Sequence, residues 1–290
     1  MAEFIDRFKD WVNERTKFLG GEKKEIKEKN PAPRIDAEFE DSLILFDNFD
    51  KSKTAKEEVL PARVSKFDGL IMNGGIERGS TILISGGAGT GKTTFGLQSL
   101  YNGVMNGEKG IYISFEEEPK KIKKHMLQNF GWDLQKLETE GKLAVLKFDP
   151  TKIARSMEEE ILKTSGGLRI PLKRIRLPFI PDKIVVDSLS ALSIAFDDKE
   201  NYRKYIRKLF ETFERINSVN FVLAETEQDP TVYSRTGTEE FLADGVVVLY
   251  NLKKNEKREN ALEILKLRSS NHVKKMVPYK ISDKGIEIIG

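Results

Sequence analysis

Short apolar runs alternate with amphipathic stretches along most of the chain beyond residue 60. The runs are almost continuously hydrophobic, as in strands of a parallel sheet that is covered on both faces. We expect such strands at 81–85, 110–115, 143–148, 183–187, 221–224 and 245–250. Apolar residues at helical spacing predict helices between them, at 93–106, 119–129 and 199–217. This alternation predicts an α/β domain with a mostly parallel central sheet, and further apolar runs at 261–268 and 277–289 predict antiparallel strands that close one edge.

The first 60 residues follow another pattern. Large apolar residues between Phe4 and Leu19 recur at helical spacing, which predicts an amphipathic helix over 3–19. A highly charged stretch with two prolines follows, a composition that is typical of a linker. We therefore divide the chain into an N-terminal helical extension with its linker, 1–60, and an α/β domain, 61–290. The helix pattern leaves open whether this helix packs on its own domain, docks to a neighbouring subunit or partner protein, or lies at a membrane surface.

Composition excludes several classes of protein. The absence of cysteine excludes a disulfide framework, a thiolate metal site and a cysteine nucleophile, and with two histidines a histidine-built zinc site is not expected. No run of about 18 apolar residues occurs, and the charged N-terminus lacks the apolar core of a signal peptide. We therefore expect a cytoplasmic protein without a membrane span. Lys and Arg number 49 against 46 Asp and Glu, a balance that does not indicate a nucleic-acid partner.

The first strand of the α/β domain runs into a glycine-rich segment that matches the Walker A pattern G-x-x-x-x-G-K-[ST] and precedes a helix. In this context the glycines let successive backbone N–H groups turn toward phosphate oxygens, and the helix N-terminus adds positive potential. Lys92 is expected to reach the β- and γ-phosphates, and the Thr93 hydroxyl to bind Mg²⁺. The pattern predicts a site for ATP and Mg²⁺. Its expected nucleotide contacts are Gly86, Gly87, Ala88, Gly89, Thr90, Gly91, Lys92, Thr93 and Thr94.

Acidic residues follow two of the expected strands, at the sheet edge where open α/β sheets bind ligands. Asp187 ends the strand 183–187, and we assign it to the Mg²⁺ shell. A phosphate loop also needs a group that orients or deprotonates the attacking water. Glu116, Glu117 and Glu118 follow the strand 110–115 and precede a proline. Glu116 is the first candidate for this base and Glu117 the second, whereas Glu118 is interpreted as a residue that favours the helix N-terminus.

Six segments occur in the chain in a recognisable order: RGSTILISGGAGTGKTTFGLQSLYNG, GIYISFEEEPKKI, FGWDL, KIVVDSLSAL, EEFLADGVVVLY and LEILKLRSSNHVKKMVPYKISDKGI. Together they resemble a single-domain KaiC-like ATPase of the RecA/RadA superfamily, of archaeal type, over about 62–290. The resemblance implies a RecA-like P-loop NTPase core and ATP bound between adjacent subunits of a homo-oligomeric ring, commonly a hexamer. It also places the general base at Glu116, with Glu117 beside it, and the Walker B acid at Asp187.

The same resemblance implies that a neighbouring subunit supplies basic residues to the phosphates. In this chain they fall on Lys266 and Arg268, two positions apart on an expected strand, so that both side chains project from one face. Two solvated cations on an exposed strand are the alternative. His272 follows in the family's K-x-R-x-x-x-H pattern. Nucleotide contact and a surface turn are both compatible with His272.

Three functions remain open after these motifs. The first is a nucleotide-switched regulatory or assembly ATPase with an unidentified protein partner, the second a RadA-paralogue-like DNA-dependent ATPase in recombination or repair, and the third a nucleotide-binding scaffold with little turnover. The loop 225–240 has five acids and one arginine, which disfavours DNA phosphates at the ligand edge. Nucleic acid is therefore not expected as a partner. We interpret the basic, proline-containing segment 165–182 as an insertion or protein-docking loop, and the lysines of 120–124 as a solvated helix face.

Overall fold

The computed structural model describes residues 58–163, 177–226, 233–254 and 257–289. Within this part of the chain, one nine-stranded sheet has the order β11-β10-β9-β8-β3-β7-β6-β4-β5. Its parallel strands are β3 (Thr81–Gly86), β4 (Gly110–Ser114), β5 (Leu143–Lys147), β6 (Lys183–Asp187), β7 (Val219–Glu225) and β8 (Gly245–Lys254). The antiparallel strands β9 (Lys257–Leu267), β10 (Val277–Ser282) and β11 (Gly285–Ile288) continue it. The predicted α/β class and antiparallel closing edge are confirmed.

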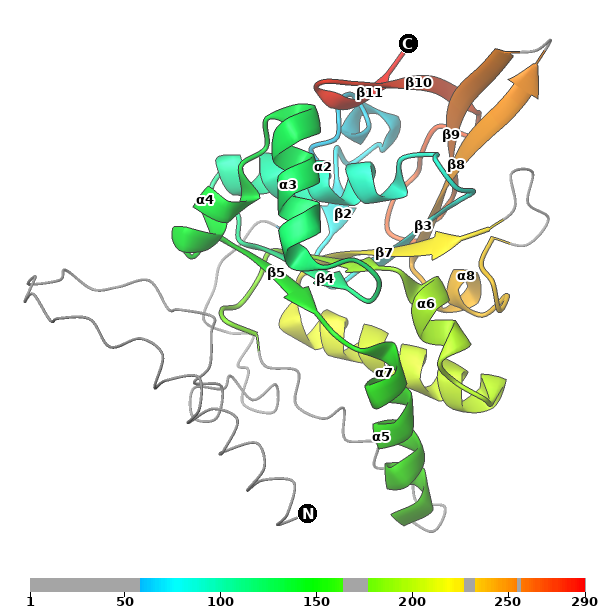
Figure 1. Ribbon diagram of the computed structural model, residues 1–290. Helices are drawn as coiled ribbons and strands as arrows, with labels where there is room; N and C mark the ends of the chain where they lie inside the picture. The colour runs from blue at the N-terminus through cyan, green and yellow to red at the C-terminus, as the bar shows by residue number, and fades with distance from the viewer. Residues whose placement is uncertain (1–57, 164–176, 227–232, 255–256, 290) are drawn as a thin grey trace, which may run out of the picture. The chain divides into compact units, whose positions relative to one another are not determined.

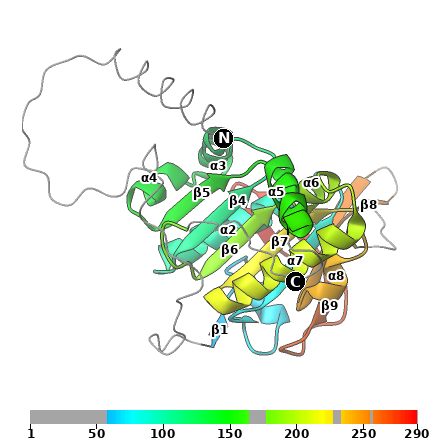
Figure 2. The same cartoon turned by 90° about the horizontal axis from the view of Figure 1, so that it is seen from below.

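Helices cover both faces of this sheet (Figures 1 and 2). One face carries α2 (Lys92–Met105), α3 (Pro119–Phe130) and α4 (Leu134–Thr139). The other carries α5 (Pro150–Lys163), α6 (Leu189–Ile194), α7 (Lys199–Ile216) and α8 (Glu239–Leu242). Because strand side chains alternate between faces, Ile82 and Ile84 of β3 belong to the core under α2, and Leu83 belongs to the core under α7. The antiparallel pair β1 (Val59–Leu60) and β2 (Ile76–Glu77) and the 3-10 turn η3 (Asp68–Leu70) precede β3 in the chain.

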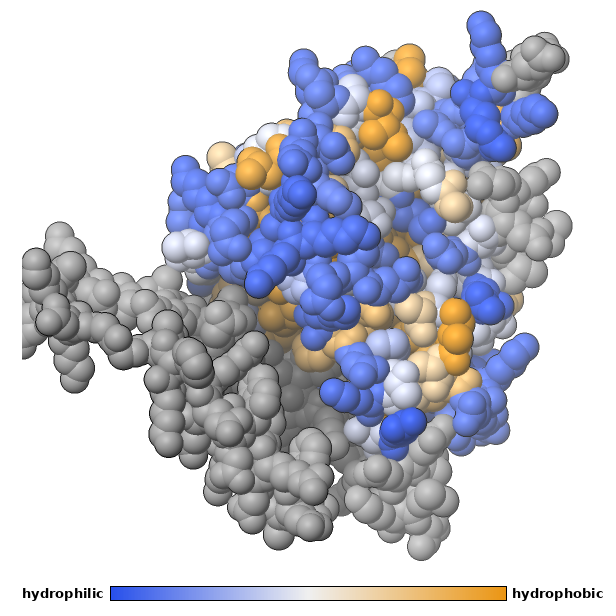
Figure 3. All heavy atoms as spheres, viewed as in Figure 1, coloured by the Kyte–Doolittle hydropathy of each residue, from blue (hydrophilic) through white to orange (hydrophobic). Residues whose placement is uncertain are grey.

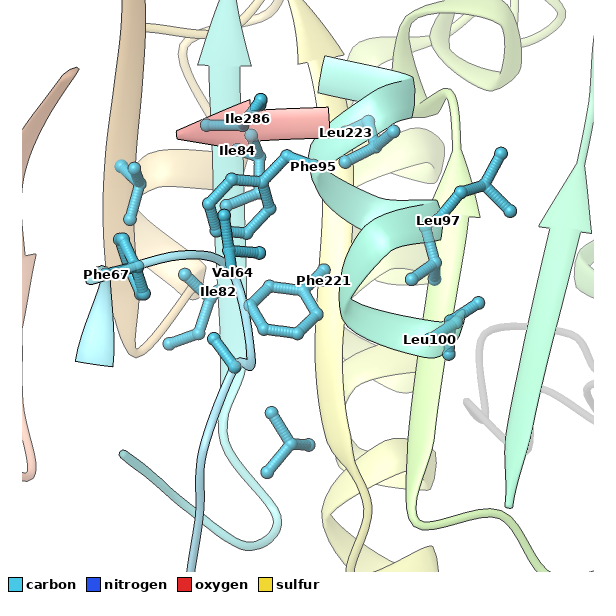
Figure 4. Packing of buried hydrophobic residues seen from close by; sticks show 14 of the residues in the cluster. Val64, Phe67, Ile82, Ile84, Phe95, Leu97, Leu100, Phe221, Leu223 and Ile286 are labelled. Carbon is cyan, nitrogen blue, oxygen red and sulfur yellow. The ribbon is translucent and has the colours of Figure 1, made fainter. Parts of the chain in front are cut away.

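Aromatic packing fixes α2, the helix that follows the glycine-rich loop. The ring of Phe95 meets the rings of Phe67 and Phe221 edge to face, with centroids 5.2 and 5.6 Å apart. Figure 4 shows Phe95 and Phe221 between α2 and the strands beneath it, together with Ile84 of β3, and Phe67, in this view, on the side of β3 away from α2. Each such pair contributes about 0.5–1.5 kcal/mol beyond the burial of its apolar area. The start of α2 is thereby held against β3 and β7.

The hydrophobic pattern predicts α2, α3 and α7 but overlooks α4, α5, α6 and α8. The start of α5 does have a sequence signal: Asp149 precedes Pro150, and its Oδ1 accepts a 2.9 Å hydrogen bond from the N–H of Thr151. The helices α4 and α6 contain six residues each and α8 contains four, too few to show helical periodicity. The predicted helix over 3–19 and most of the segment 165–182 lie outside the described residues. The domain boundary near residue 60 stays a prediction.

The lysine-rich face of α3 is hydrophilic where Figure 3 shows it. Lys121 pairs with Glu117 at 2.7 Å, and Lys123 pairs with Glu138 at 2.6 Å, so two of its cations already have acidic partners. The exposed Lys121 agrees with the interpretation of this helix face as solvated, whereas Lys123 is only 16% exposed and its ion pair with Glu138 is largely buried. Among the helices that the structure describes, none is long and apolar enough to cross a membrane.

Candidate nucleotide-binding site

The glycine-rich loop joins the end of β3 to the start of α2, and its backbone requires glycine at particular positions. Gly89 and Gly91 have φ angles of +77° and +89°, a region that side-chain-bearing residues rarely adopt. A Cβ on Gly86 would lie 2.5 Å from the carbonyl oxygen of Leu249, so β8 leaves no room for one. Thr90 closes the turn by donating from Oγ1 to the carbonyl of Gly87 at 2.9 Å. The loop is thus a tight backbone cradle of the kind that phosphates occupy.

Lys92, the first residue of α2, lies over this cradle. Its Nζ donates to the carbonyl oxygens of Gly86 at 2.8 Å and Gly87 at 3.0 Å. Burial lowers the pKa of Lys92, and the nearby carboxylates of Glu225, Asp187 and Glu116 act in the opposite direction. Glu225 ends β7 and stands beside Gly86 in the register of β3 and β7. The sequence pattern did not single out Glu225, because only the strand order places the end of β7 next to the loop.

Asp187 lies at the end of β6, where two hydroxyl groups meet one of its carboxylate oxygens. Thr93 donates from Oγ1 to Oδ2 of Asp187 at 2.7 Å, and the Tyr112 hydroxyl donates to the same oxygen. Burial raises the pKa of Asp187, and these two hydrogen bonds act against that shift because they stabilise the carboxylate. The structure therefore brings together the two residues that the sequence assigned to Mg²⁺. Tyr112, in the middle of an ordinary apolar strand, had no sequence signal.

The donor set at Thr93 and Asp187 fits Mg²⁺ shared with a nucleotide. Both side chains offer hard oxygen atoms, the ligand type that Mg²⁺ prefers. In the described ranges no group of three or more His, Cys, Asp or Glu side chains is placed to hold a metal. The pair of Thr93 and Asp187 suits Mg²⁺, which commonly binds one or two protein oxygens and completes its shell with substrate phosphates and water.

Glu116 and Glu117 follow β4 but point to different partners. Oε1 of Glu116 accepts a 2.6 Å hydrogen bond from Ser188, the residue after Asp187. Glu117 instead forms the 2.7 Å ion pair with Lys121 on α3. Glu118 is the N-cap residue of α3, as expected. The geometry favours Glu116 as the candidate base, and Ser188 is a residue of this site that the sequence pattern did not identify.

Lys266 and Arg268 lie at the other edge of the sheet from the glycine-rich loop. The N–H of Arg268 donates to the carbonyl of Asp244 at 2.9 Å, and the N–H of Asp244 donates to the carbonyl of Thr81, the first residue of β3, at 2.8 Å. Since β3 is six residues long, about 17 Å separate its start from Gly86. The structure does not bring these two cations to their own chain's Lys92.

Both cations face α8. Lys266 donates from Nζ to the carbonyl oxygens of Glu240 at 3.0 Å and Ala243 at 2.6 Å. Arg268 lies 3.3 Å from the carboxylate of Asp244, with 56% of its side chain exposed. Pairing between β8 and β9 shifts register at Val246 and Val247, so β9 carries a bulge just before Lys266. The two cations project from one face of β9, as the sequence predicted, although β9 ends at Leu267.

His272 lies in the connection from β9 to β10. It forms an isolated antiparallel bridge with Ile71, and its Nδ1 is 3.3 Å from the carbonyl oxygen of Val273. In the sequence, His272 follows Lys266 and Arg268 by a few residues. Its role in nucleotide contact stays a prediction.

A family model described as the KaiC ATPase matches residues 60–290. This chain belongs to the KaiC ATPase family. The circadian clock oscillator protein KaiC of Acaryochloris marina is 35% identical over 243 residues, which are 82% of this chain and 45% of that protein. The circadian clock protein KaiC3 of a Synechocystis species is 34% identical over 236 residues, 80% of this chain and 46% of that protein. The chain thus spans less than half the length of these curated KaiC relatives.

A solved structure is similar over almost its whole length. The crystal structure of a KaiC-like protein from the hyperthermophilic archaeon Pyrococcus horikoshii is 30% identical and superposes with a TM-score of 0.66. The match covers 80% of this chain and 99% of that one. The RecA-like fold expected for a KaiC-like ATPase of archaeal type is therefore confirmed.

Proposed function

We propose that this chain is a Mg²⁺-dependent ATP-hydrolysing KaiC-like protein that works as a homo-oligomeric ring. In this proposal its nucleotide state changes its affinity for a protein partner, so the chain acts as a regulatory or assembly factor. Support comes from the backbone cradle at Gly86–Lys92 and from the carboxylates that surround it. It also comes from membership of the KaiC ATPase family.

Each residue of the site has a defined task in this proposal. The loop amides and Lys92 bind the phosphates, and Thr93 and Asp187 hold Mg²⁺, which supplies positive charge against the phosphate oxygens. Glu116 receives the proton of the attacking water at Oε2, because Ser188 already occupies Oε1. Glu117 is bound to Lys121 and is the second candidate for this base.

The single observation that carries the ring proposal is the separation between Arg268 and Lys92 at opposite edges of one sheet. An arginine that stabilises charge on a transferring phosphoryl group must touch it. Arg268 is too far from its own chain's loop to do so, but a second copy stacked head to tail would bring its exposed Arg268 to the first copy's phosphates. Such a heterologous contact repeats from copy to copy and gives a ring when its rotation closes.

Mixing two inactive variants tests this proposal. Arg268→Ala keeps an intact phosphate loop but supplies no arginine, whereas Lys92→Ala supplies the arginine but has no working loop. Each variant alone is expected to be nearly inactive. In mixed assemblies, an Arg268→Ala site beside a Lys92→Ala neighbour receives a functional Arg268, so part of the ATPase activity returns.

Arg258→Ala is the matched control for this experiment. Arg258 is an exposed arginine at the other end of β9, where it donates to Oδ1 of Asn251 at 3.0 Å. Its loss is expected to leave turnover close to that of the unchanged chain. Absence of any recovery in verified mixed assemblies would show that Arg268 does not act between subunits.

A further inference from the structure

The C-terminal hairpin of β10 and β11 is built onto the glycine-rich loop and α2. Gln98 of α2 pairs with the backbone of Ile286 like a strand residue: its Oε1 accepts from the Ile286 N–H at 2.7 Å, and its Nε2 donates to the Ile286 carbonyl at 3.1 Å. Figure 4 shows the Ile286 side chain near Ile84 and Phe95, at the start of α2. This hairpin therefore shares one core with the helix that follows the loop.

Two further contacts reach the loop itself. The hydroxyl of Tyr279 on β10 donates a 2.5 Å hydrogen bond to the carbonyl oxygen of Thr90. Ile281, two residues further along β10, lies so close to Gly91 that a Cβ on Gly91 would be 2.7 Å from its Cδ1. Both contacts act at the peptide unit that joins Thr90 to Gly91.

The surroundings of Tyr279 leave its hydroxyl one task, which is to donate the hydrogen bond to Thr90. Its side chain is 3% exposed, and its ring belongs to the core under α2. Burial raises the pKa of Tyr279, so the hydroxyl stays protonated and keeps its donor hydrogen. Thr90 is fully buried, so no water competes for its carbonyl oxygen.

The direction of one carbonyl sets the direction of the next N–H. A trans peptide unit is planar, and its C=O and N–H bonds point to opposite sides. Holding the Thr90 carbonyl toward Tyr279 therefore turns the N–H of Gly91 away from the hairpin. Gly91 has φ near +89°, where a glycine backbone meets little resistance to rotation, so the loop needs an outside contact to keep this peptide in one orientation.

We propose that Tyr279 is a positioning residue of the nucleotide site, whose hydroxyl fixes the Thr90–Gly91 peptide so that the Gly91 N–H faces the phosphates. Tyr279 touches no substrate in this proposal and acts only through the loop. The inference rests on the proposed function, because it requires that the loop binds phosphates. Its specific consequence is that Tyr279 contributes to the affinity for phosphates and not to the affinity for the nucleoside.

The test compares the affinities for ATP and for adenosine, each with Mg²⁺, in the full-length chain. Tyr279→Phe removes only the hydroxyl group and keeps the buried ring. We expect its ATP affinity to fall about tenfold, the loss that one misdirected hydrogen bond to a charged group causes, while its adenosine affinity stays within about twofold. Replacing Tyr279 by 4-aminophenylalanine keeps a donor at the same ring position and is expected to restore the affinity ratio.

Tyr250→Phe is the matched control. Tyr250 is a buried tyrosine of β8 whose hydroxyl donates to Oε2 of Glu263 at 3.1 Å, on another part of the same sheet. Both variants are expected to lose some thermal stability, since each removes a hydrogen bond made by the hydroxyl of a buried tyrosine. Only Tyr279→Phe is expected to change the ratio of ATP to adenosine affinity. An unchanged ratio in Tyr279→Phe, or an equal loss for both ligands, would overturn the positioning role.

A measurement on the unchanged chain covers the case in which Tyr279→Phe does not fold. Hydrogen exchange resolved to the Gly91 amide is expected to slow with ATP and not with adenosine. Exchange that ATP leaves unchanged would overturn the inference. Failure of the proposed function has a different signature, because ATP affinity would then be insensitive to Lys92→Ala as well.

Discussion

Ser188 donates a 2.6 Å hydrogen bond to Oε1 of Glu116, although 72 positions separate them in the chain. The sheet explains the contact: β4 and β6 are neighbours, with Ser114 paired to Asp187, so the residues just beyond the two strand ends meet. Ser188 thereby orients one of two adjacent glutamates. The other, Glu117, is held by Lys121. The structure thus gives these two carboxylates different partners, whereas the sequence only ordered them as candidates for the general base.

The first prediction concerns these glutamates. Glu116→Gln keeps the shape and a hydrogen-bonding group but loses basicity, so turnover is expected to fall by roughly 10²-fold or more while ATP still binds. Glu117→Gln is expected to keep most of its turnover. Phosphate release and ATP binding, measured on both variants, check the prediction. A dead Glu117→Gln beside an active Glu116→Gln would reverse the assignment.

The second prediction concerns Lys92. Lys92→Ala removes a charged donor from the phosphates, a loss of about 1.5–3 kcal/mol that weakens ATP binding about tenfold or more. Lys120→Ala, on the exposed face of α3, is the control and is expected to bind ATP like the unchanged chain. Calorimetric titration with Mg²⁺ and ATP measures both. Equal affinities in the two variants would remove Lys92 from the site.

The third prediction concerns nucleic acid. Glu225 stands next to the loop at the ligand edge, and the segment after it is acidic in sequence. We expect neither single- nor double-stranded DNA to stimulate ATPase activity at physiological salt, because DNA sites concentrate Lys and Arg. Activity is measured with and without DNA over a range of salt concentrations. A several-fold stimulation that fades as salt rises would favour the RadA-like function instead.

The fourth prediction concerns stability and pH. Lys183 is 1% exposed and forms a 2.8 Å ion pair with Glu108, and burial lowers the pKa of Lys183 below its ordinary value of 10.5. Between the folded-state and unfolded-state pKa values the unfolded chain binds more protons, so Lys183 makes the free energy of unfolding rise with pH there. The slope reaches at most about 1.4 kcal/mol per pH unit for one proton.

Lys183→Met removes the titrating ammonium, so the difference between the two chains measures its contribution to the pH dependence. Urea unfolding of the two chains between about pH 8 and about pH 10.5 gives the difference. The unchanged chain is expected to gain stability relative to Lys183→Met as pH rises through this window. A constant difference would mean that the ammonium of Lys183 titrates alike in the folded and unfolded chains.

The sequence predicts the parts of the fold and of the site that follow from regular hydrophobic patterns and short motifs. Apolar runs locate the parallel strands, and the Walker A pattern locates the loop at Gly86–Lys92. Asp187 and Glu116 are predictable because an acid at the end of a buried parallel strand falls at the ligand edge. The roles of these residues stay predictions, since their chemistry is tested by the experiments above.

The unpredicted parts depend on strand order and on long-range contacts. Glu225 is next to Gly86 only because β7 lies beside β3. Tyr112 and Tyr279 are apolar-pattern residues whose hydroxyl groups find partners 75 and 189 positions away in the chain. Local periodicity identifies such residues as part of the core but does not predict the hydrogen-bond partner of the hydroxyl group that each one carries.

The bulge in β9 decides on which side of the sheet Lys266 and Arg268 emerge. Val247 pairs with Ile264 but Val246 pairs with Lys266, so Leu265 is the extra residue. Ile264 and Leu267 face the core under α2, and if Leu265 were kept but the bulge were lost, regular alternation would send positions 266 and 268 to that same side. The face of the sheet on which these cations lie therefore depends on whether this one extra residue interrupts the alternation of side chains along β9. A substitution that abolished the bulge while keeping every residue of β9 in place would leave the cation pair itself unchanged and yet turn both side chains to the opposite face of the sheet.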